Sequence, residues 1–435
     1  MELMNQPFTG QLGNRLIELL DSSKYHTLNI AVAFAKNSGV LRIKESLDRF
    51  RAQGGKVNIY VGVDLGGTSY EALTALLLHT DSLNVIHAEK GQTFHPKIYQ
   101  FIGEDTGLVI VGSHNLTGGG LWTNFESSMH VPLVDGCAES KSVLMGLDNY
   151  FETLTSLERS FMSINTQEEV EELLNSGYVF KEIKTRVRQQ KAAISDGSSK
   201  RLFGNGVQAH LPCVLRIKYD KAVDNEQFIE PESVDSADLE VQYAPETATQ
   251  SIAEGIDSLS LSFENDESPT IWFETRKMTG GSRNILDLSM RSLVERGDIT
   301  GTSFDLEENG FMRGGVEFFG LNPLDTSHGK DIVLNFEGVD YQGNTILFPV
   351  GDKANGTWRL QIKGISSNGR RITDAFRAHG EEYYLVAKII SFTKIEGDYY
   401  FMSVFPESEL EDFRSISRIL ARNGRTITAK QLGIF

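Results

Sequence analysis

The sequence is poor in several features that would otherwise define its class. Its 435 residues include only two cysteines, Cys137 and Cys213, which cannot supply a disulfide framework or a cysteine zinc site. No run approaches the roughly 20 apolar residues of a membrane-spanning helix. The first ten residues lack the basic and apolar regions of a signal peptide. We therefore expect a soluble, cytoplasmic protein that does not act at a membrane.

Motifs that bind nucleotides or metals are also missing. The chain contains no GxxxxGK[ST] loop, no HExxH and no clustered Asp/Glu/Lys motif of the kind found in metal-dependent nucleases. We expect no cofactor and no metal site. Any dependence on ATP would have to come from another protein.

The charge is strongly acidic overall but unevenly distributed. A formal net charge of −17 argues against a protein that coats nucleic acid by bulk charge. Residues 222–268 contain thirteen acidic residues and no lysine or arginine, whereas residues 353–379 contain six basic residues and one acidic residue. The acidic segment is either a solvated linker or a DNA mimic that occupies a positive channel until a target binds. The basic segment is a local patch that the average conceals.

The first 150 residues alternate between strand-like and helix-like patterns, and the domain is expected to extend to residue 192. We expect strands at 27–34, 56–64, 83–89, 95–103 and 107–115, and helices at 39–55, 69–79 and within 139–192. Such alternation, with nearly continuous apolar strands, predicts an α/β domain whose mixed sheet is flanked by helices.

The remainder of the chain has a different character. Residues 193–268 are predicted to form a hinge and an acidic linker. Residues 269–435 contain short β-rich runs separated by glycine turns, such as 315–321 and 330–338. Repeated short strands of this kind predict a β-rich barrel or sandwich as the last domain.

One constellation of residues has the composition of a phosphodiester-cleaving site. His95 and Lys97 alternate on a predicted strand, Ser113 and Asn115 end the next strand, and Glu126 follows a glycine-rich loop. An antiparallel hairpin through residues 103–107 would bring these residues together. An imidazole can attack phosphorus, lysine and asparagine can hold the phosphate oxygens, and a carboxylate can orient the imidazole. Each residue alone has an ordinary structural explanation, so the prediction depends on the combination.

HPK at residues 95–97 and GSHN at residues 112–115 resemble the HxK…GSxN signature of the phospholipase D superfamily. That signature usually has an aspartate five residues after the lysine, where this chain has Ile102. This departure, together with Glu126 after GSHN, is similar to the nuclease branch represented by BfiI/NgoFVII-type restriction endonucleases. The resemblance is specific over about 30 residues.

The resemblance implies a sequence-specific endonuclease that cleaves double-stranded DNA without metal. His95 would form a covalent phosphohistidine, and a second histidine would protonate the leaving oxygen. Because the chain carries one such motif and the superfamily uses two, the resemblance implies a homodimer whose nuclease domains share one active site.

The resemblance also implies a B-three-like pseudobarrel at residues 269–435, with two arms that contact the major groove. Arginine and asparagine can read bases there, while lysine and serine mostly hold phosphates. The expected DNA-binding residues lie in the segments 274–284 and 351–364: Arg276, Lys277, Ser282, Arg283, Asn284, Lys353, Asn355, Trp358, Arg359 and Lys363.

Three alternative functions are compatible with the sequence. The chain could be the nuclease subunit of an ATP-dependent restriction complex with a separate helicase-like partner. It could be a phospholipase D-like phosphodiesterase, although Ile102 and the single motif count against this. It could also be a DNA-binding protein whose nuclease domain serves only for dimerisation, which the intact His95 and Lys97 make less attractive.

Overall fold

The computed structural model describes residues 1–183, 207, 209–214, 268–275, 283–350, 356–379 and 383–435. The chain divides into two compact units, Met1–Lys218 (unit 1) and Tyr219–Phe435 (unit 2). The predicted hinge and nearly all of the acidic linker lie outside the described residues, so the three-part division stays a prediction. Five expected DNA-binding residues also lie outside them: Arg276, Lys277, Ser282, Lys353 and Asn355.

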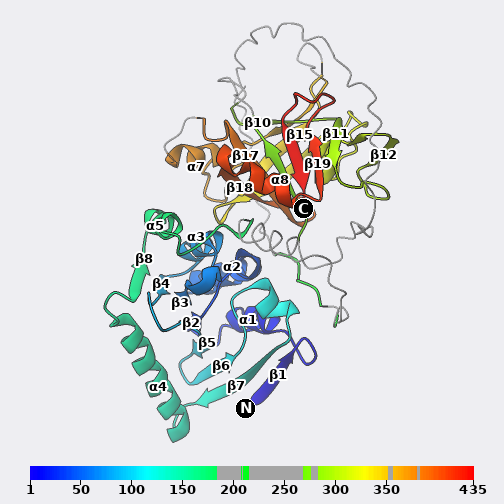
Figure 1. Cartoon of the computed structure of the whole chain (residues 1–435). Coiled ribbons are helices and arrows are strands. Elements are labelled where there is room, and N and C mark those ends of the chain that lie inside the picture. The colour runs from blue at the N-terminus through cyan, green and yellow to red at the C-terminus, as the bar shows by residue number, and fades with distance from the viewer. Residues whose placement is uncertain (184–206, 208, 215–267, 276–282, 351–355, 380–382) are drawn as a thin grey trace, which may run out of the picture. The chain divides into compact units, whose positions relative to one another are not determined.

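Unit 1 is built on an eight-stranded mixed sheet with the strand order β1-β7-β6-β5-β2-β3-β4-β8 (Figure 1). The pairs β2/β3 and β3/β4 are parallel, and the other pairs are antiparallel. The elements are β1 (Glu2–Gln6), α1 (Leu12–Leu20), β2 (Thr27–Val32), α2 (Asn37–Ala52), β3 (Lys56–Gly62), η1 (Asp64–Gly66), α3 (Tyr70–His79), β4 (Ser82–Ile86), β5 (Lys97–Ile102), β6 (Thr106–Gly112), η2 (Gly119–Thr123), β7 (Glu126–Val134), α4 (Ala138–Thr155), β8 (Phe161–Ile164) and α5 (Gln167–Asn175).

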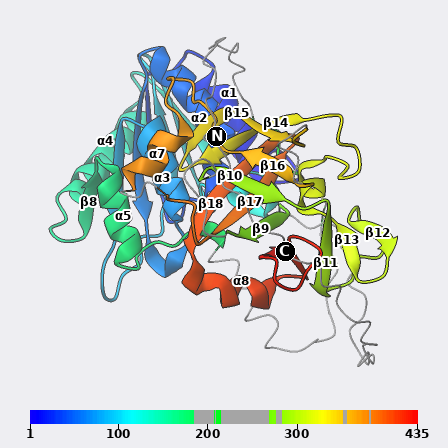
Figure 2. The same ribbon diagram turned by 90° about the horizontal axis from the view of Figure 1, so that it is seen from above.

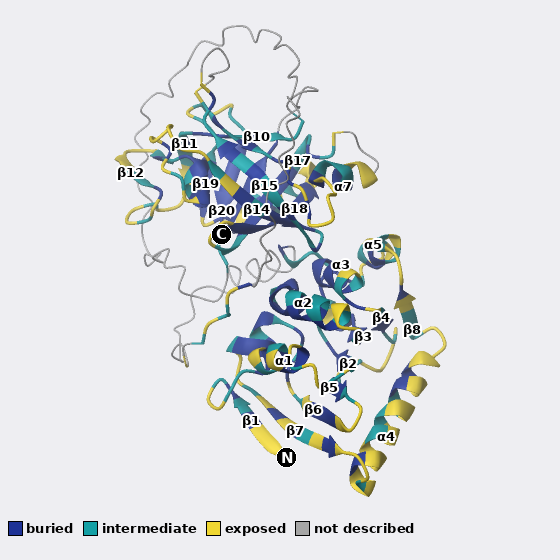
Figure 3. Cartoon of the chain, turned by 180° about the vertical axis from the view of Figure 1, so that it is seen from behind, coloured by how far each residue is buried: buried dark blue, intermediate teal, exposed yellow. Residues whose placement is uncertain are grey.

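Helices cover both faces of this sheet. Apolar residues of α1, α2 and α3 share one buried core with the sheet, for example Leu16, Ile43 and Leu73. On the opposite face, Phe151 and Leu154 of α4 belong to a second, smaller buried cluster with residues of β2 and β4. Figure 3 shows that α2 is largely buried, whereas the start of β1 and much of α4 are exposed. The prediction of a mixed sheet flanked by helices is confirmed.

Three parts of unit 1 differ from the prediction. The sequence pattern did not reveal β1 and α1, and the segment 139–192, expected to be helical, contains the strand β8 between α4 and α5. β8 has only four residues, too few for a period-two pattern to stand out between two helices. β1 is held by antiparallel pairing with β7, more than 120 residues later in the chain (Glu2 opposite His130), which a local pattern cannot reveal.

Unit 2 contains one twelve-stranded hydrogen-bonded sheet with the order β10-β16-β15-β14-β18-β17-β9-β20-β19-β11-β13-β12. Strands β9, β17 and β18 lie side by side in it, as Figure 2 also shows. The elements are β9 (Thr270–Glu274), β10 (Ile285–Leu288), β11 (Arg291–Arg296), β12 (Asp305–Glu308), β13 (Phe311–Arg313), η4 (Gly315–Phe319), β14 (Lys330–Phe336), β15 (Val339–Leu347), β16 (Trp358–Gln361), α7 (Ile372–Ala378), β17 (Lys388–Glu396), β18 (Tyr399–Pro406), η6 (Glu407–Glu409), α8 (Leu410–Ile416), β19 (Ile419–Arg422) and β20 (Gln431–Ile434).

The second large sheet fits the β-rich character expected for the last part of the chain, with one correction. Residues 315–321 were expected to form a strand, but Gly315–Phe319 form the 3-10 helix η4. Its side chains Val316 and Phe319, three residues apart, are both fully buried, which suits the period of a 3-10 turn rather than that of a strand. The likeness to a B-three pseudobarrel stays a prediction. None of the described helices is both long enough and apolar enough to cross a membrane.

A buried carboxyl group lies in the first turn of α3. Glu71 is 2% exposed, and its Oε2 accepts a hydrogen bond from Glu182 N at 3.0 Å. In the described part of the chain, its Oε1 has no hydrogen-bond partner. Burial, reinforced by the nearby Glu182 charge, raises the pKa of Glu71 to about 8.

The raised pKa of Glu71 should make the stability of unit 1 depend on pH. Because the folded-state pKa exceeds the unfolded one, the carboxyl is neutral in the fold at low pH. Stability is then lost as pH rises from about 4.5 to about 8. Since each pKa unit corresponds to about 1.4 kcal/mol, we expect Glu71→Gln to raise the free energy of unfolding by a few kcal/mol at pH 9.

The measurement is urea denaturation of the Glu71→Gln variant at pH 5 and pH 9, with wild type alongside. At pH 5 the two proteins should differ little. Glu168→Gln, in the exposed first turn of α5, is the matched control. An equal effect of Glu71→Gln at both pH values would contradict the expectation.

Candidate active site

The five residues expected to be catalytic lie at one edge of the unit 1 sheet. Strand β5 begins there and the neighbouring β6 ends there, because the two form an antiparallel hairpin with Ile98 opposite Val111. Strand β7 also begins there, with Ser128 opposite Gly112. This register brings together the expected residues His95, Lys97, Ser113, Asn115 and Glu126. The hairpin through residues 103–107 is confirmed.

Gly112 allows the strands to approach closely at this edge. A Cβ atom at position 112 would lie 2.2 Å from Ser127 O and 2.6 Å from Ser128 Cβ, which no side chain tolerates. With no side chain at position 112, the start of β7 lies close to the end of β6. The glycine of the GSHN motif is therefore required by packing.

His95 and Lys97 form the centre of the cluster. Lys97 Nζ lies 2.8 Å from His95 Nδ1, 3.0 Å from His95 Nε2 and 3.2 Å from His95 O. The lone-pair directions of the two ring nitrogens diverge, so the ammonium can donate to at most one of them. A neutral imidazole has a lone pair on only one ring nitrogen, so the nitrogen that accepts from Lys97 is the nucleophilic one and the other carries the proton. The His95 side chain is exposed to solvent.

The relation of these two residues to the strand differs from the prediction. His95 precedes β5 and is not part of it, because Pro96 has no N–H to contribute to the sheet. Pro96 O instead accepts a hydrogen bond from Ala33 N at 2.9 Å. Phe34 packs its ring edge-on against the His95 ring, with centroids 5.9 Å apart. His95 is thus positioned by the end of β2, while Lys97 points back toward it.

The ammonium of Lys97 is held in a buried position. Lys97 is 8% exposed, and burial lowers its pKa below the ordinary lysine value. The nearby Glu126 carboxylate opposes this effect and raises the pKa of Lys97. The charge of Glu126 therefore helps to keep a buried lysine protonated.

Glu126 is fixed by neighbours on the same edge. Its Oε2 accepts a hydrogen bond from Ser113 Oγ, and its Oε1 accepts one from Asn124 Nδ2 at 3.2 Å. Ser113 Oγ also accepts from Ser127 N at 3.1 Å. The carboxylate expected to orient the His95 imidazole thus contacts Ser113 and Asn124.

Asn115 has an unused hydrogen-bonding group. Its Oδ1 is buried and has no hydrogen-bond partner in the described part of the chain. A buried amide oxygen without a partner is costly, and such exceptions concentrate at functional sites. Gly120 packs against the Asn115 backbone, and a Cβ atom there would lie 2.4 Å from Asn115 O. The glycine-rich loop therefore fixes the position of Asn115.

Two buried histidines, His114 of the GSHN turn and His130 of β7, are connected through Ser128. His114 Nδ1 lies 2.8 Å from Gly120 O, and its Nε2 lies 3.1 Å from Ser128 Oγ, which in turn lies 3.1 Å from His130 Nε2. Burial lowers the pKa of both His114 and His130. Only a weak indication of this hydrogen-bonded series was present in the sequence. The indication was that Ser128 and His130 are two residues apart on a strand.

Two further supporting residues were not identified from the sequence. Gln6, at the end of β1, is fully buried and donates from Nε2 to Gly119 O, Gly120 O and Asn124 O at 3.1–3.2 Å. Asp64 accepts from Phe94 N at 3.1 Å, directly before His95 in the chain. Both contacts join segments far apart in sequence, so no local pattern could have revealed them.

Five expected DNA-binding residues are described in unit 2, and they differ in exposure. Trp358 is fully buried and donates from Nε1 to Pro323 O at 3.0 Å, so it is a core residue with no ring surface for DNA. Lys363 is exposed and Arg359 is half-buried. Asn284 O accepts from Ile362 N at 2.9 Å, so Asn284 and Arg283 lie beside the end of β16.

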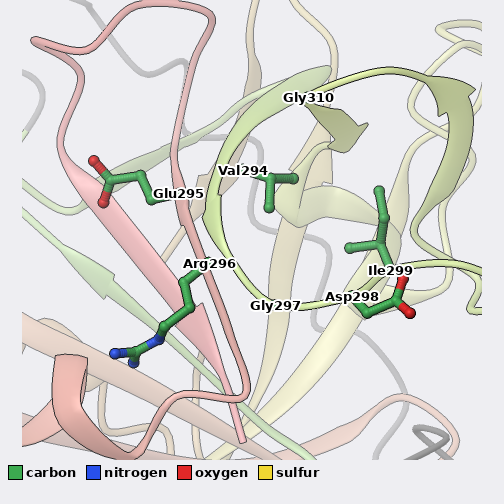
Figure 4. Close-up of a pocket in the computed structure, with 7 residues that line it drawn as sticks. All are labelled: Val294, Glu295, Arg296, Gly297, Asp298, Ile299 and Gly310. Carbon is green, nitrogen blue, oxygen red and sulfur yellow. The ribbon is translucent and has the colours of Figure 1, made fainter. Parts of the chain in front are cut away.

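A shallow cavity of about 350 Å³ lies near the end of β11 in unit 2 (Figure 4). It contains none of the expected DNA-binding residues. The Arg296 guanidinium donates to Ser417 O at 3.1 Å, and Glu295 accepts from Arg422 at 2.6 Å. The charged groups beside this cavity are therefore used within the protein. Among the described residues, no three His, Cys, Asp or Glu side chains are grouped as metal ligands would be.

No protein-family model matches the sequence, and no curated protein sequence matches it. Among solved structures, the chain is similar to a polyphosphate kinase from Porphyromonas gingivalis, with 13% identity and a TM-score of 0.24. That match covers 35% of this chain and only 21% of the kinase.

Two smaller proteins are matched over nearly their whole length. Nuc from Salmonella typhimurium, a phospholipase D family member, has 15% identity and a TM-score of 0.27 over 38% of this chain and 97% of Nuc. NucT from Helicobacter pylori has 18% identity and a TM-score of 0.26 over 38% of this chain and 98% of NucT. Scores this low carry no conclusion about function.

The environment of Lys97 can be tested without any substrate. We expect Lys97 to titrate below the ordinary lysine value of about 10.4, because burial disfavours the ammonium. In Glu126→Gln the opposing carboxylate is removed, so the pKa of Lys97 should fall further. Nitrogen-detected NMR of the Lys97 side chain as a function of pH measures both values.

Glu104→Gln is the matched control for this titration. Glu104 is an exposed carboxylate in the turn of the same β5–β6 hairpin, at the opposite end from Lys97. Its removal should leave the Lys97 titration unchanged. The interpretation fails if Glu126→Gln and Glu104→Gln have the same effect.

Proposed function

We propose that the chain is a phosphodiesterase that cleaves DNA through a covalent intermediate on His95. The observation that carries the proposal is the exposed His95 imidazole beside the buried Lys97 ammonium, with Nζ 2.8 and 3.0 Å from the two ring nitrogens. A nucleophile next to a fixed positive charge suits attack on an anionic phosphodiester. Asn115 follows the end of β6 at the same edge.

The proposed chemistry has two displacements. In the first, Lys97 turns from the His95 ring to the phosphate, the ring nitrogen that carries the lone pair forms a bond to phosphorus, and the bond from phosphorus to the leaving oxygen breaks. In the second, water attacks phosphorus, the P–N bond breaks, and neutral imidazole is regenerated. Lys97 and the Asn115 amide would stabilise the negative charge on the non-bridging oxygens during both steps.

The leaving oxygen must receive a proton, and a second imidazole is the natural donor. His114 and His130 do not suit this role, because both are buried and share hydrogen bonds through Ser128. We propose that His95 of a second copy of the chain supplies the proton and later accepts one from water. The enzyme would then be a homodimer with one shared site.

Unit 2 is proposed to select the DNA sequence. Arg283, Asn284 and Lys363 gather at one end of the β10/β16 ladder, where Ile285 lies opposite Gln361. Arginine, asparagine and lysine are side chains that contact bases and phosphates. In this proposal the complete enzyme acts as a restriction endonuclease, with or without a separate ATP-dependent partner.

The proposal is tested by incubating the purified protein with supercoiled plasmid in EDTA. We expect nicking or linearisation by wild type, because the proposed nucleophile is an imidazole rather than a metal-bound water. His95→Ala should lower the rate by at least about a thousand-fold, since it removes the nucleophile. His26→Ala, an exposed histidine at the opposite end of β2, should retain wild-type activity.

Cleavage that requires added magnesium and persists in His95→Ala would contradict the proposal. Phosphatidylcholine vesicles tested in parallel distinguish a phospholipase. Lipid hydrolysis without DNA cleavage would show that the site acts on another phosphodiester.

A further inference from the structure

Two exposed aromatic rings lie directly beside the candidate active site. Phe8 and Phe125 are 66% and 63% exposed, although burial of a phenylalanine ring is normally favourable. Their planes are nearly parallel, at 12°, and their centroids are 5.6 Å apart. At this distance the rings are offset and together form one apolar surface, the Phe8/Phe125 platform.

The backbone holds both members of the platform in place. Gln6 lies opposite Glu126 in the β1/β7 pair, so Phe8 and Phe125 extend from the same end of this pair. Gln6 Nε2 donates to Asn124 O at 3.1 Å, next to Phe125. Thr9 N donates to Asn5 O at 2.9 Å and closes the turn that carries Phe8. The platform is therefore tied to the strand that begins with Glu126.

The platform and two of the candidate catalytic residues, Ser113 and Glu126, line the same cavity. This cavity has a volume of about 670 Å³ and is lined by Phe8 and Phe125 together with Gly112, Ser113 and Glu126. A group that rests on the rings would thus be adjacent to the Ser113–Glu126 pair. Because the platform lies next to this pair, we expect it to contact the substrate of the site.

We propose that the Phe8/Phe125 platform binds an unpaired nucleobase next to the scissile phosphate. Exposed aromatic rings stack on bases of any sequence, because every base has a flat π-face. A paired base inside a duplex has both faces covered, so the platform selects single-stranded DNA or a base that has left the stack. The inference rests on the proposed function, since it assumes that the adjacent residues act on a nucleic acid.

The rival occupant is a second copy of this chain, which could cover the two rings at a subunit contact. A nucleobase is favoured because the rings line the cavity that also contains Ser113 and Glu126, two of the residues expected to be catalytic. The two occupants make different demands on the side chains. A subunit contact requires apolar area, whereas base stacking requires an aromatic face.

The test compares how tightly the protein binds two fluorescein-labelled DNA strands of 12 nucleotides, an oligothymidylate and an abasic strand. Fluorescence anisotropy gives each Kd, and light scattering gives the molecular mass of the protein. Wild type should bind the oligothymidylate at least about fivefold more tightly than the abasic strand. The Phe8→Leu/Phe125→Leu double variant keeps apolar area but loses the rings. Its Kd values for the two strands should become nearly equal, with a ratio near one, and the molecular mass of the protein should stay unchanged.

Met145→Ala is the control, because Met145 is an exposed apolar residue on α4 with 57% exposure. It should retain the wild-type ratio. A double variant that retains the ratio, or that changes the mass of the protein, overturns the inference, as does a wild-type ratio near one.

The result is separable from that of the proposed function. If the wild-type protein cleaves plasmid but binds the oligothymidylate and the abasic strand equally well, the base-binding role of the platform is rejected and the proposed chemistry is not. A base-dependent ratio that disappears in the double variant, without any cleavage of DNA, rejects the proposed chemistry alone.

Discussion

The register of the β5–β6–β7 meander is the constraint on which the candidate site depends. Side chains alternate along a strand, so a slip of one residue would move Lys97 to the other face of the sheet. The observed register places Lys97 across Gly112 from the start of β7, and only glycine permits this approach. The same register gives a buried ammonium a nearby carboxylate, Glu126. Strand pairing therefore sets the electrostatics of the site.

Around this meander, supporting contacts come from distant parts of the chain. Gln6 binds the glycine-rich loop, Asp64 binds the backbone next to His95, and Tyr99 donates to His114 O at 3.1 Å beneath the GSHN turn. A site that holds the His95 imidazole beside the Lys97 ammonium in a fixed geometry needs such support. The long-range contacts explain why a short motif requires a whole α/β unit, and why an exposed aromatic platform can be held beside it.

Much of the fold and the centre of the site could be predicted from local sequence. The apolar runs on either side of residues 103–107 predicted the hairpin, and the hairpin brought Lys97 toward Ser113. The rest depended on long-range pairing or on single residues. Pro96 kept His95 off the strand, and β1 becomes a strand only by pairing with β7. Trp358 was expected to contact DNA, yet the core of unit 2 buries it. Composition alone cannot distinguish a buried tryptophan from an exposed one.

The central claim is that His95 attacks phosphorus. Its most direct test is to quench a reaction with DNA carrying a radioactive phosphate at the cleaved position, and to examine the protein for an acid-labile, alkali-stable phosphoramidate. Peptide mapping by mass spectrometry would locate the adduct. We expect labelled DNA attached to the peptide that contains His95, and no adduct in His95→Ala. DNA cleavage at full rate with no covalent adduct, or with an adduct on another residue, would contradict the mechanism.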